Sequence, residues 1–189
     1  MRQVMLLSIL TGCMPDISDT LDPGPCPEGA EEVVADVSTT VVVTDSGLEV
    51  PITITQLMVN ATDYDNWVYM DLSVPEENDT TWQLGFKRFQ VELGDGVDAA
   101  ILDQIVIEDA YIPDEGWQVD QPDADGDGQP ELVFGDWFDY SYEGHTLTPK
   151  ERTYVVRGPE AIYALAFESY YDEAGTSAMI SLRLRVLEE

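Results

Sequence analysis

A run of alternating aspartates between residues 123 and 131 has the residue types and spacing that metal binding requires. Asp123, Asp125 and Asp127 are separated by single small residues, and Gly128 allows a sharp turn that directs several carboxylates toward one point. Oxygen ligands of this kind suit Ca²⁺, and the run matches the Asp-x-Asp-x-Asp-Gly half of the EF-hand template. The predicted calcium ligands are Asp123, Asp125, Asp127, the Gln129 carbonyl and Glu131.

The second half of the EF-hand template is not met. Its twelfth position normally supplies a bidentate Glu, but here it is Phe134, and Glu131 and Asp136 are the candidates to replace that ligand. No flanking helices are apparent. Two interpretations stay open: a calcium-binding loop that orders a long insertion, and a hydrated acidic loop without an ion.

Cys13 is the second residue whose position predicts chemistry. It follows a short apolar run, residues 4–10, and the small residues Thr11 and Gly12, which is the arrangement that lipoprotein processing requires. The run is too short to span a bilayer core of about 30 Å, so it predicts a signal peptide rather than a membrane helix. We expect a signal peptide over residues 1–12 and a lipid on Cys13. The residue after Cys13 is Met14 rather than Asp, which resembles the sorting signal that sends Gram-negative lipoproteins to the outer membrane.

The charge of the chain limits its partners. There are 38 acidic residues against 8 Lys and Arg, which gives a formal net charge of -30. A surface of this sign repels nucleic acid and anionic lipid headgroups, so we expect no nucleic-acid partner and contact with the membrane through the lipid alone. The sequence contains no HExxH, Walker or dinucleotide motif and no Gly-x-Ser-x-Gly, and we predict that the protein is not an enzyme.

The hydrophobic pattern predicts one mainly antiparallel β domain. Residues 13–30 are rich in Pro, Gly and acids and predict a disordered tether, whereas residues 31–189 show period-2 alternation and no 3.6-residue apolar stripe. The expected strands cover residues 33–43, 48–59, 67–72, 82–93, 101–107, 163–167 and 178–186, with turns at 45–47 and 172–175. The apolar phase flips at Lys87-Arg88, which predicts a β-bulge inside one strand.

Three segments, in order, resemble the HmuY family of haem-binding envelope lipoproteins. They are Tyr64-Asp-Asn-Trp-Val-Tyr69, then Trp82-Gln-Leu-Gly-Phe-Lys-Arg88 with the Gly-rich Gly94-Asp-Gly96, and finally the stretch from Trp137 through Val156-Arg157-Gly158 to Tyr170-Tyr171. Together they span most of the chain beyond residue 64. The resemblance implies a β-rich fold that captures haem, with the iron held by two axial side chains. It also implies haem or a haem-protein as partner and an outer-membrane receptor.

The axial ligands that the resemblance implies carry over only in part. One family histidine follows the Trp that matches Trp137, and that position here is Tyr142; the segment that supplies the other contains no histidine or methionine. The chain has one histidine, His145, and imidazole and deprotonated phenol are both admissible axial ligands of haem iron. On an extended segment Tyr142 and His145 would lie on opposite faces, so one ligand is favoured over two. The alternatives are a solvated loop histidine and an ordinary strand tyrosine.

The haem propionates need a cation in so acidic a chain. The candidates are Lys87, Arg88 and Arg157, and the planar guanidinium of arginine suits carboxylates best. The leading hypothesis is therefore a haem-binding lipoprotein with altered axial ligation. The alternative, from a different class, is a surface or adhesion module that is ordered by Ca²⁺ and binds no haem.

Overall fold

The computed structural model describes residues 33–43 and 49–187, without the side chains of residues 36, 39–43, 49 and 50. The predicted signal peptide, the lipidated Cys13, the tether and the turn at 45–47 lie outside the described residues. Among the residues that are described, no helix has both the length and the apolar character that crossing a membrane would need.

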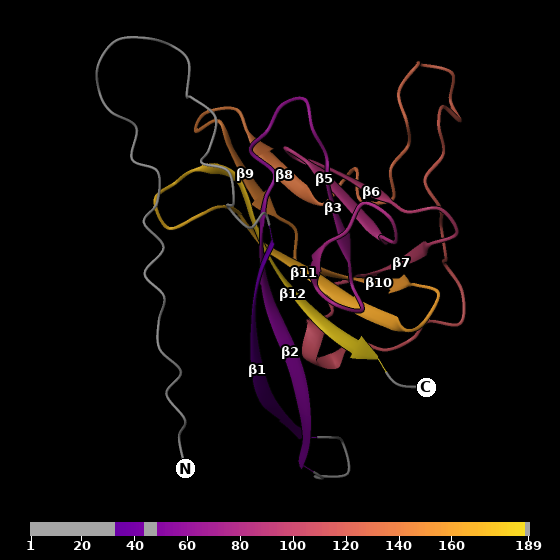
Figure 1. Cartoon of the computed structure of the whole chain (residues 1–189), viewed down its shortest axis with the longest axis vertical. Helices are drawn as coiled ribbons and strands as arrows, with labels where there is room; N and C mark the ends of the chain where they lie inside the picture. The colour runs from indigo at the N-terminus through magenta and orange to yellow at the C-terminus, as the bar shows by residue number, and fades with distance from the viewer. Residues whose placement is uncertain (1–32, 44–48, 188–189) are drawn as a thin grey trace. The chain divides into compact units, whose positions relative to one another are not determined.

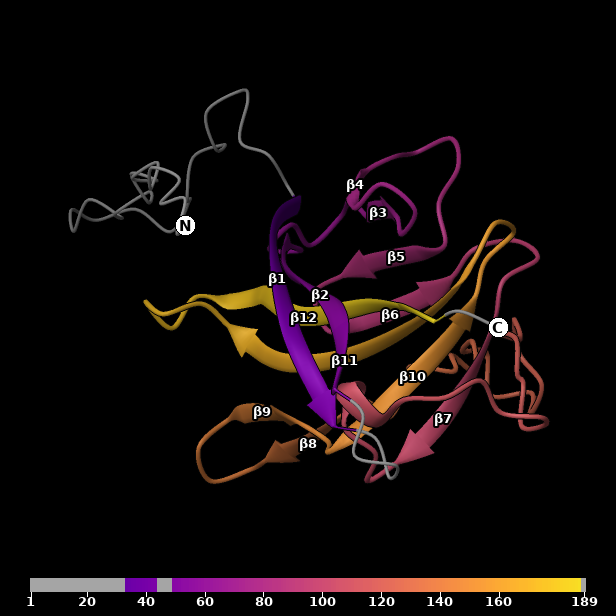
Figure 2. The same cartoon turned by 90° about the horizontal axis from the view of Figure 1, so that it is seen from below.

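Two antiparallel sheets make up most of the structure (Figures 1 and 2). The larger has the order β1-β2-β12-β11-β10-β7, and the smaller has the order β4-β3-β5-β6. The strands of the larger sheet are β1 Val33–Val43, β2 Glu49–Asn60, β7 Asp98–Asp103, β10 Arg152–Arg157, β11 Ile162–Tyr171 and β12 Ser177–Leu187. The smaller sheet consists of β3 Val68–Asp71, β4 Glu76–Glu77, β5 Leu84–Lys87 and β6 Gln90–Leu93.

The main core forms between the inner faces of these two sheets. Ile180 and Leu182 of β12 belong to the same buried cluster as Leu84 and Phe86 of β5, and alternate residues of β10 and β11 contribute in the same way. A second, smaller cluster lies on the other face of the larger sheet. It includes Val155 of β10 and Ile107 from the single helical turn, η1 Ile107–Asp109. The prediction of a single antiparallel β-rich domain is confirmed.

The third sheet is a lone hairpin of two short strands, β8 Phe138–Ser141 and β9 Thr146–Pro149. In Figure 2 its loop extends away from the two larger sheets. The buried Trp137, immediately before β8, ties the hairpin to the core. Its ring stacks on Phe167 of β11 at a centroid distance of 4.5 Å, and its Nε1 donates a hydrogen bond of 2.8 Å to the Phe89 carbonyl.

Two details of the predicted strands are wrong. The phase flip at Lys87-Arg88 is not a bulge: β5 ends at Lys87 and a tight turn through Arg88, which has a φ of 55°, leads into β6. The strand expected over 101–107 begins and ends earlier, as β7, because Ile107 starts the helical turn. Val186 continues the alternation of β12, as expected, although its side chain is 54% exposed. The C-terminal hairpin is confirmed, and Gly175 closes its turn by donating to the Asp172 carbonyl.

Replacing one inward side chain of β12 tests this architecture. Ile180→Ala removes a side chain that is 0% exposed between the sheets, and we expect the free energy of unfolding in urea to fall by about 2–5 kcal/mol. Val186→Ala on the same strand is the matched control and should change the free energy by no more than about 0.5 kcal/mol. Equal losses for the two variants would contradict the assignment of the inner face.

Candidate functional site

The loop that joins β8 to β9 contains both predicted iron ligands. Residues 142–145 form this loop, and Tyr142 is 83% exposed at its tip. His145 is also exposed, and its φ of 50° lies in the left-handed region. The neighbouring Gly144 does not adopt a positive φ. The expectation of an extended segment with the two side chains on opposite faces is therefore wrong, because the chain reverses direction between them.

Tyr140 brings the loop residues together. Its hydroxyl lies 2.7 Å from Nδ1 of His145, and its ring meets the ring of Tyr142 edge-on at a centroid distance of 5.0 Å. The hydrogen bond can run from Nδ1–H to the phenol oxygen or from the hydroxyl to Nδ1, depending on the imidazole tautomer. In the first case Nε2 presents a lone pair that could bind a metal. Tyr140 at the end of β8 and the two loop residues Tyr142 and His145 thus place two phenols and one imidazole side by side.

An apolar strip leads from this cluster to the β5–β6 turn. Phe138 and Tyr140 are two residues apart on β8 and share one face of the hairpin. Phe138 packs edge-on against Phe89 of the turn at a centroid distance of 5.9 Å, and Phe89 is 49% exposed. Leu147, opposite Tyr140 on β9, donates its backbone N–H to the Tyr171 hydroxyl at 3.1 Å. Half-exposed aromatic rings are therefore available beside the loop, and they suit a flat apolar ligand.

Arg88 is the predicted propionate partner whose backbone adjoins this strip, since it immediately precedes Phe89 in the β5–β6 turn. Its guanidinium donates to the Thr62 carbonyl and the Ser177 hydroxyl and lies 4.3 Å from the centre of the exposed Tyr64 ring. These contacts hold the side chain in place. Within the described part of the chain, no carboxylate lies within 4.0 Å of it.

The other two basic candidates point elsewhere. Lys87 lies over the Trp67 ring at 5.3 Å, on the outer face of the smaller sheet. Arg157 stacks on Trp117 at 3.7 Å and pairs with Asp98 at 3.5 Å. At about 3.3 Å per residue, Arg157 lies about 16 Å further along β10 than Arg152, which contacts the start of the hairpin through the Asp136 carbonyl. The structure does not bring Arg157 to the hairpin loop.

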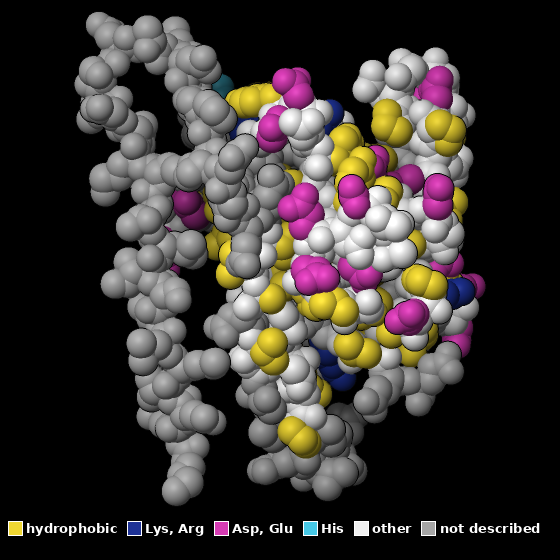
Figure 3. All heavy atoms as spheres, viewed as in Figure 1, with side chains coloured by type: hydrophobic (Ala, Val, Ile, Leu, Met, Phe, Trp, Pro, Cys, Tyr) yellow, Lys and Arg dark blue, Asp and Glu magenta, His cyan; other side chains and the backbone are white. Residues whose placement is uncertain are grey.

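The surrounding surface is acidic. Acidic side chains are scattered over the face seen in Figure 3, where basic ones are few. Lys150, Arg152 and Arg183 each pair with carboxylates. Among the described basic residues, Lys87, Arg88 and Arg185 have no carboxylate within 4.0 Å. Of these three, Arg88 is the one that adjoins the strip in sequence, which makes it the candidate anion partner there.

Two tyrosines near the strip are unsuitable as iron ligands. Burial raises the pKa of the Tyr170 phenol, and it raises the pKa of Tyr154 to about 12, so both groups keep their protons at neutral pH. Both side chains are almost fully buried, at 4% and 1% exposure. On the hairpin, the exposed phenols are those of Tyr140 and Tyr142.

The aspartate-rich segment, residues 121–131, forms an arm that extends away from the strands (Figure 1). Gln121 and Glu131 pair at its base through two backbone hydrogen bonds. The Asp120 carboxylate accepts hydrogen bonds from the Leu93 and Val133 amides at 2.6 and 2.7 Å, which fixes both ends of the arm to β6. Burial raises the pKa of Asp120 despite these two donors. The arm is thus anchored independently of any ion.

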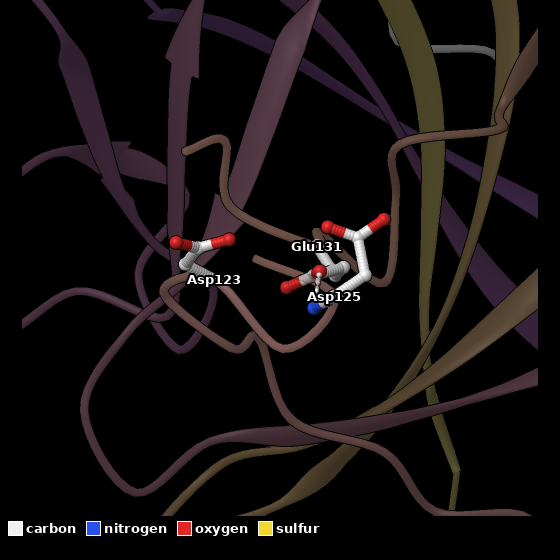
Figure 4. A group of neighbouring side chains, drawn as sticks. All are labelled: Asp123, Asp125 and Glu131. Carbon is white, nitrogen blue, oxygen red and sulfur yellow. Dashed lines mark hydrogen bonds between the residues drawn. The ribbon is translucent and has the colours of Figure 1, made fainter. Parts of the chain in front are cut away.

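Carboxylate oxygens of Asp123, Asp125 and Glu131 converge to within 4.8 Å of one another (Figure 4). Backbone amides occupy part of this acceptor capacity. Glu131 accepts from the Ala124 and Asp125 amides, which lowers the pKa of its carboxyl, and Asp123 accepts from Gly128. The structure brings together three of the predicted calcium ligands, and the ligation itself stays a prediction.

Asp127, the remaining predicted carboxylate ligand, is not part of this group. Asp127 accepts from the Gln129 amide instead of joining the three converging carboxylates. Phe134, at the twelfth position of the template, is fully buried in the core, and Asp136 pairs with Lys150. Of the two candidates to replace the missing ligand, the structure places Glu131, and not Asp136, beside the aspartates.

The fold, rather than the sequence, relates this chain to known proteins. No model of a protein family matches the chain, and no curated protein matches it. A crystal structure of a protein assigned as a lipoprotein from Bacteroides fragilis has a TM-score of 0.55 at 17% identity, over 72% of this chain and 92% of that one. A protein described as an HmuY-like haem-binding protein from Bacteroides vulgatus has a TM-score of 0.54 at 15% identity, over 72% of this chain and 93% of that one. The chain has the HmuY-like fold.

The predicted resemblance to HmuY-like proteins is confirmed at the level of the fold. Tyr140 and Phe89 were missed by the sequence analysis, although both belong to the cluster that the fold creates. The alternation of Tyr140 and Tyr142 around Ser141 is a visible signal, but their proximity to His145 depends on the tight loop. Phe89 contacts Phe138 of the hairpin from the β5–β6 turn, and the sequence did not predict that turn.

The calcium prediction is tested by titrating the protein with Ca²⁺ in a calorimeter. We expect saturable heat and a rise in melting temperature, because an ion would relieve the repulsion among the three convergent carboxylates. Asp125→Ala should remove both effects, and Asp114→Ala, a change to another exposed acid that is not in the group, should leave them intact. Absence of heat in the unaltered protein would leave the arm as a hydrated acidic loop.

Proposed function

We propose that the protein is a cell-envelope lipoprotein that binds haem on the β8–β9 hairpin, next to the β5–β6 turn. The observation that supports this most strongly is the cluster of Tyr140, Tyr142 and His145 at one end of an apolar strip that has Arg88 at the other. An iron ligand, flat aromatic surfaces and a cation for propionates are the three features that haem capture requires. The HmuY-like fold is consistent with this role.

The donor set fits haem. His145 and Tyr142 are exposed, and the hydrogen bond between Nδ1 and the Tyr140 hydroxyl orients the imidazole, as outer partners of metal-bound histidines do. Phe89 and Phe138 offer ring faces and edges for the macrocycle, and Arg88 offers two N–H donors to a carboxylate. When bound, haem would bring an iron that accepts one of the hairpin groups as axial ligand.

The remaining parts of the proposal follow from the predicted lipid on Cys13. The domain would be held at the outer membrane by this anchor, and it would take haem, free or from a haem-protein, and deliver it to a receptor. No catalytic step is assigned to it. The second candidate function is a surface module that is ordered by Ca²⁺ and binds no haem, and the three convergent carboxylates of the arm favour it.

Haemin titration followed by absorption distinguishes the two functions. We expect saturable one-to-one binding and a shifted Soret band. Arg88→Gln should weaken binding by about 10–100-fold, since a hydrogen bond to a charged group contributes about 1.5–3 kcal/mol. Arg157→Gln is the matched control, because the same change is made far from the hairpin, and it should bind like the unaltered protein.

Two results would count against haem binding at this site. A spectrum identical to that of free haemin at all protein concentrations would leave only the β scaffold and the calcium hypothesis. Equal weakening by Arg88→Gln and Arg157→Gln would move the site away from the hairpin. The melting temperature of each variant checks that Arg88→Gln has not simply unfolded the turn.

A further inference from the structure

We infer that Tyr140 is the iron ligand and that His145 is its hydrogen-bond partner, so that the site selects ferric haem. This inference rests on the proposed function and assigns roles within the same site. It departs from the interpretation of His145 or Tyr142 as the axial ligand, because it assigns the iron to the Tyr140 oxygen, which lies 2.7 Å from Nδ1 of His145.

The backbone of the loop is shaped to make this contact. His145 adopts a φ of 50°, a conformation that a non-glycine residue rarely takes, although the adjacent Gly144 would take it at less cost. This conformation places the imidazole nitrogen against the hydroxyl of Tyr140 across the hairpin. The two rings are inclined at 53° with centroids 6.2 Å apart, so they meet through their polar atoms rather than by stacking.

A tyrosine binds iron as the phenolate, and the pairing supplies what this change requires. Tyr140 would hold the iron through its phenol oxygen. The hydroxyl proton that it would give up on binding would be accepted by Nδ1 of His145, which lies 2.7 Å away. A base within hydrogen-bond distance is the usual means of activating a hydroxyl group for such a step. His145 is thus a positioning residue and proton acceptor, and it has no contact with the iron.

The position of Tyr140 also favours it over Tyr142. Tyr140 shares its face of the hairpin with Phe138, so its oxygen lies at the edge of the apolar strip that would receive the macrocycle. Tyr142 is 83% exposed and meets the Tyr140 ring edge-on, outside that face. Its hydroxyl makes no hydrogen bond to a described residue that could take its proton.

An anionic ligand makes the site sensitive to the oxidation state of the iron. Ferric iron carries one more positive charge than ferrous iron, and the Coulomb attraction of a phenolate is correspondingly larger. Reduction by an added reductant such as dithionite places one electron on the iron and weakens this bond. The site is therefore predicted to hold ferric haem and to release it on reduction.

The test is the spectrum of the ferric haem-loaded protein, recorded for the unaltered chain and three variants. We expect a phenolate-to-iron charge-transfer band and phenolate modes in resonance Raman spectra of the unaltered protein. Tyr140→Phe should lose both. His145→Gln should keep the phenolate signature and lower haemin affinity by about 10–100-fold, which is the usual effect of removing an outer-shell partner. Tyr111→Phe, the same change at an exposed tyrosine outside the hairpin, is the control and should change neither property.

The outcomes separate this inference from the proposed function. If the unaltered protein does not bind haemin at all, both fail. If it binds with an imidazole-type spectrum that His145→Gln abolishes and Tyr140→Phe retains, haem binding stands and the ligand assignment is overturned. Retention of haem with unchanged affinity after dithionite reduction would also overturn it. The spectrum of the unaltered protein answers the question even if a variant fails to fold.

Discussion

The buried indole of Trp137 is the contact on which the candidate site depends. Its ring stacks on Phe167 in the larger sheet, and its N–H donates to the Phe89 carbonyl in the turn of the smaller sheet. One side chain therefore fixes the start of the hairpin relative to both sheets. Among the described strands, the hairpin has no partner in either larger sheet. Its position therefore depends on side chains: on Trp137 first, and also on the hydrogen bond from Leu147 to Tyr171 and on the packing of Phe138 against Phe89.

Charge is the second constraint. A protein with a formal charge of -30 disfavours an anionic ligand unless a cation is free to meet it. Most basic side chains near the hairpin are already paired with carboxylates, as Lys150 and Arg152 are with Asp136. Arg88 differs because backbone and hydroxyl oxygens hold it, and these neutral partners leave its positive charge uncompensated. Under the proposed function, Arg88 is the group that would meet the haem propionates.

Much of the fold could be predicted from the sequence, because strands such as β11 and β12 repeat their apolar residues with a period of two. The turn at Arg88 could not, since a flip of hydrophobic phase has the same pattern for a bulge and for a two-residue reversal. The site was predicted only in part. His145 and Tyr142 were visible as residue types, whereas the pairing of His145 with Tyr140 depends on the left-handed backbone at residue 145.

The most direct measurement of where haem binds is the NMR spectrum of the ¹⁵N-labelled protein during a haemin titration. Ferric haem is paramagnetic and broadens the signals of nearby amides. The account predicts that signals from residues 138–149 and from Arg88 and Phe89 broaden first. Signals from the arm at 121–131 and from Arg157 should remain sharp. Broadening centred on any other surface, or none at equimolar haemin, would contradict a haem site on this hairpin.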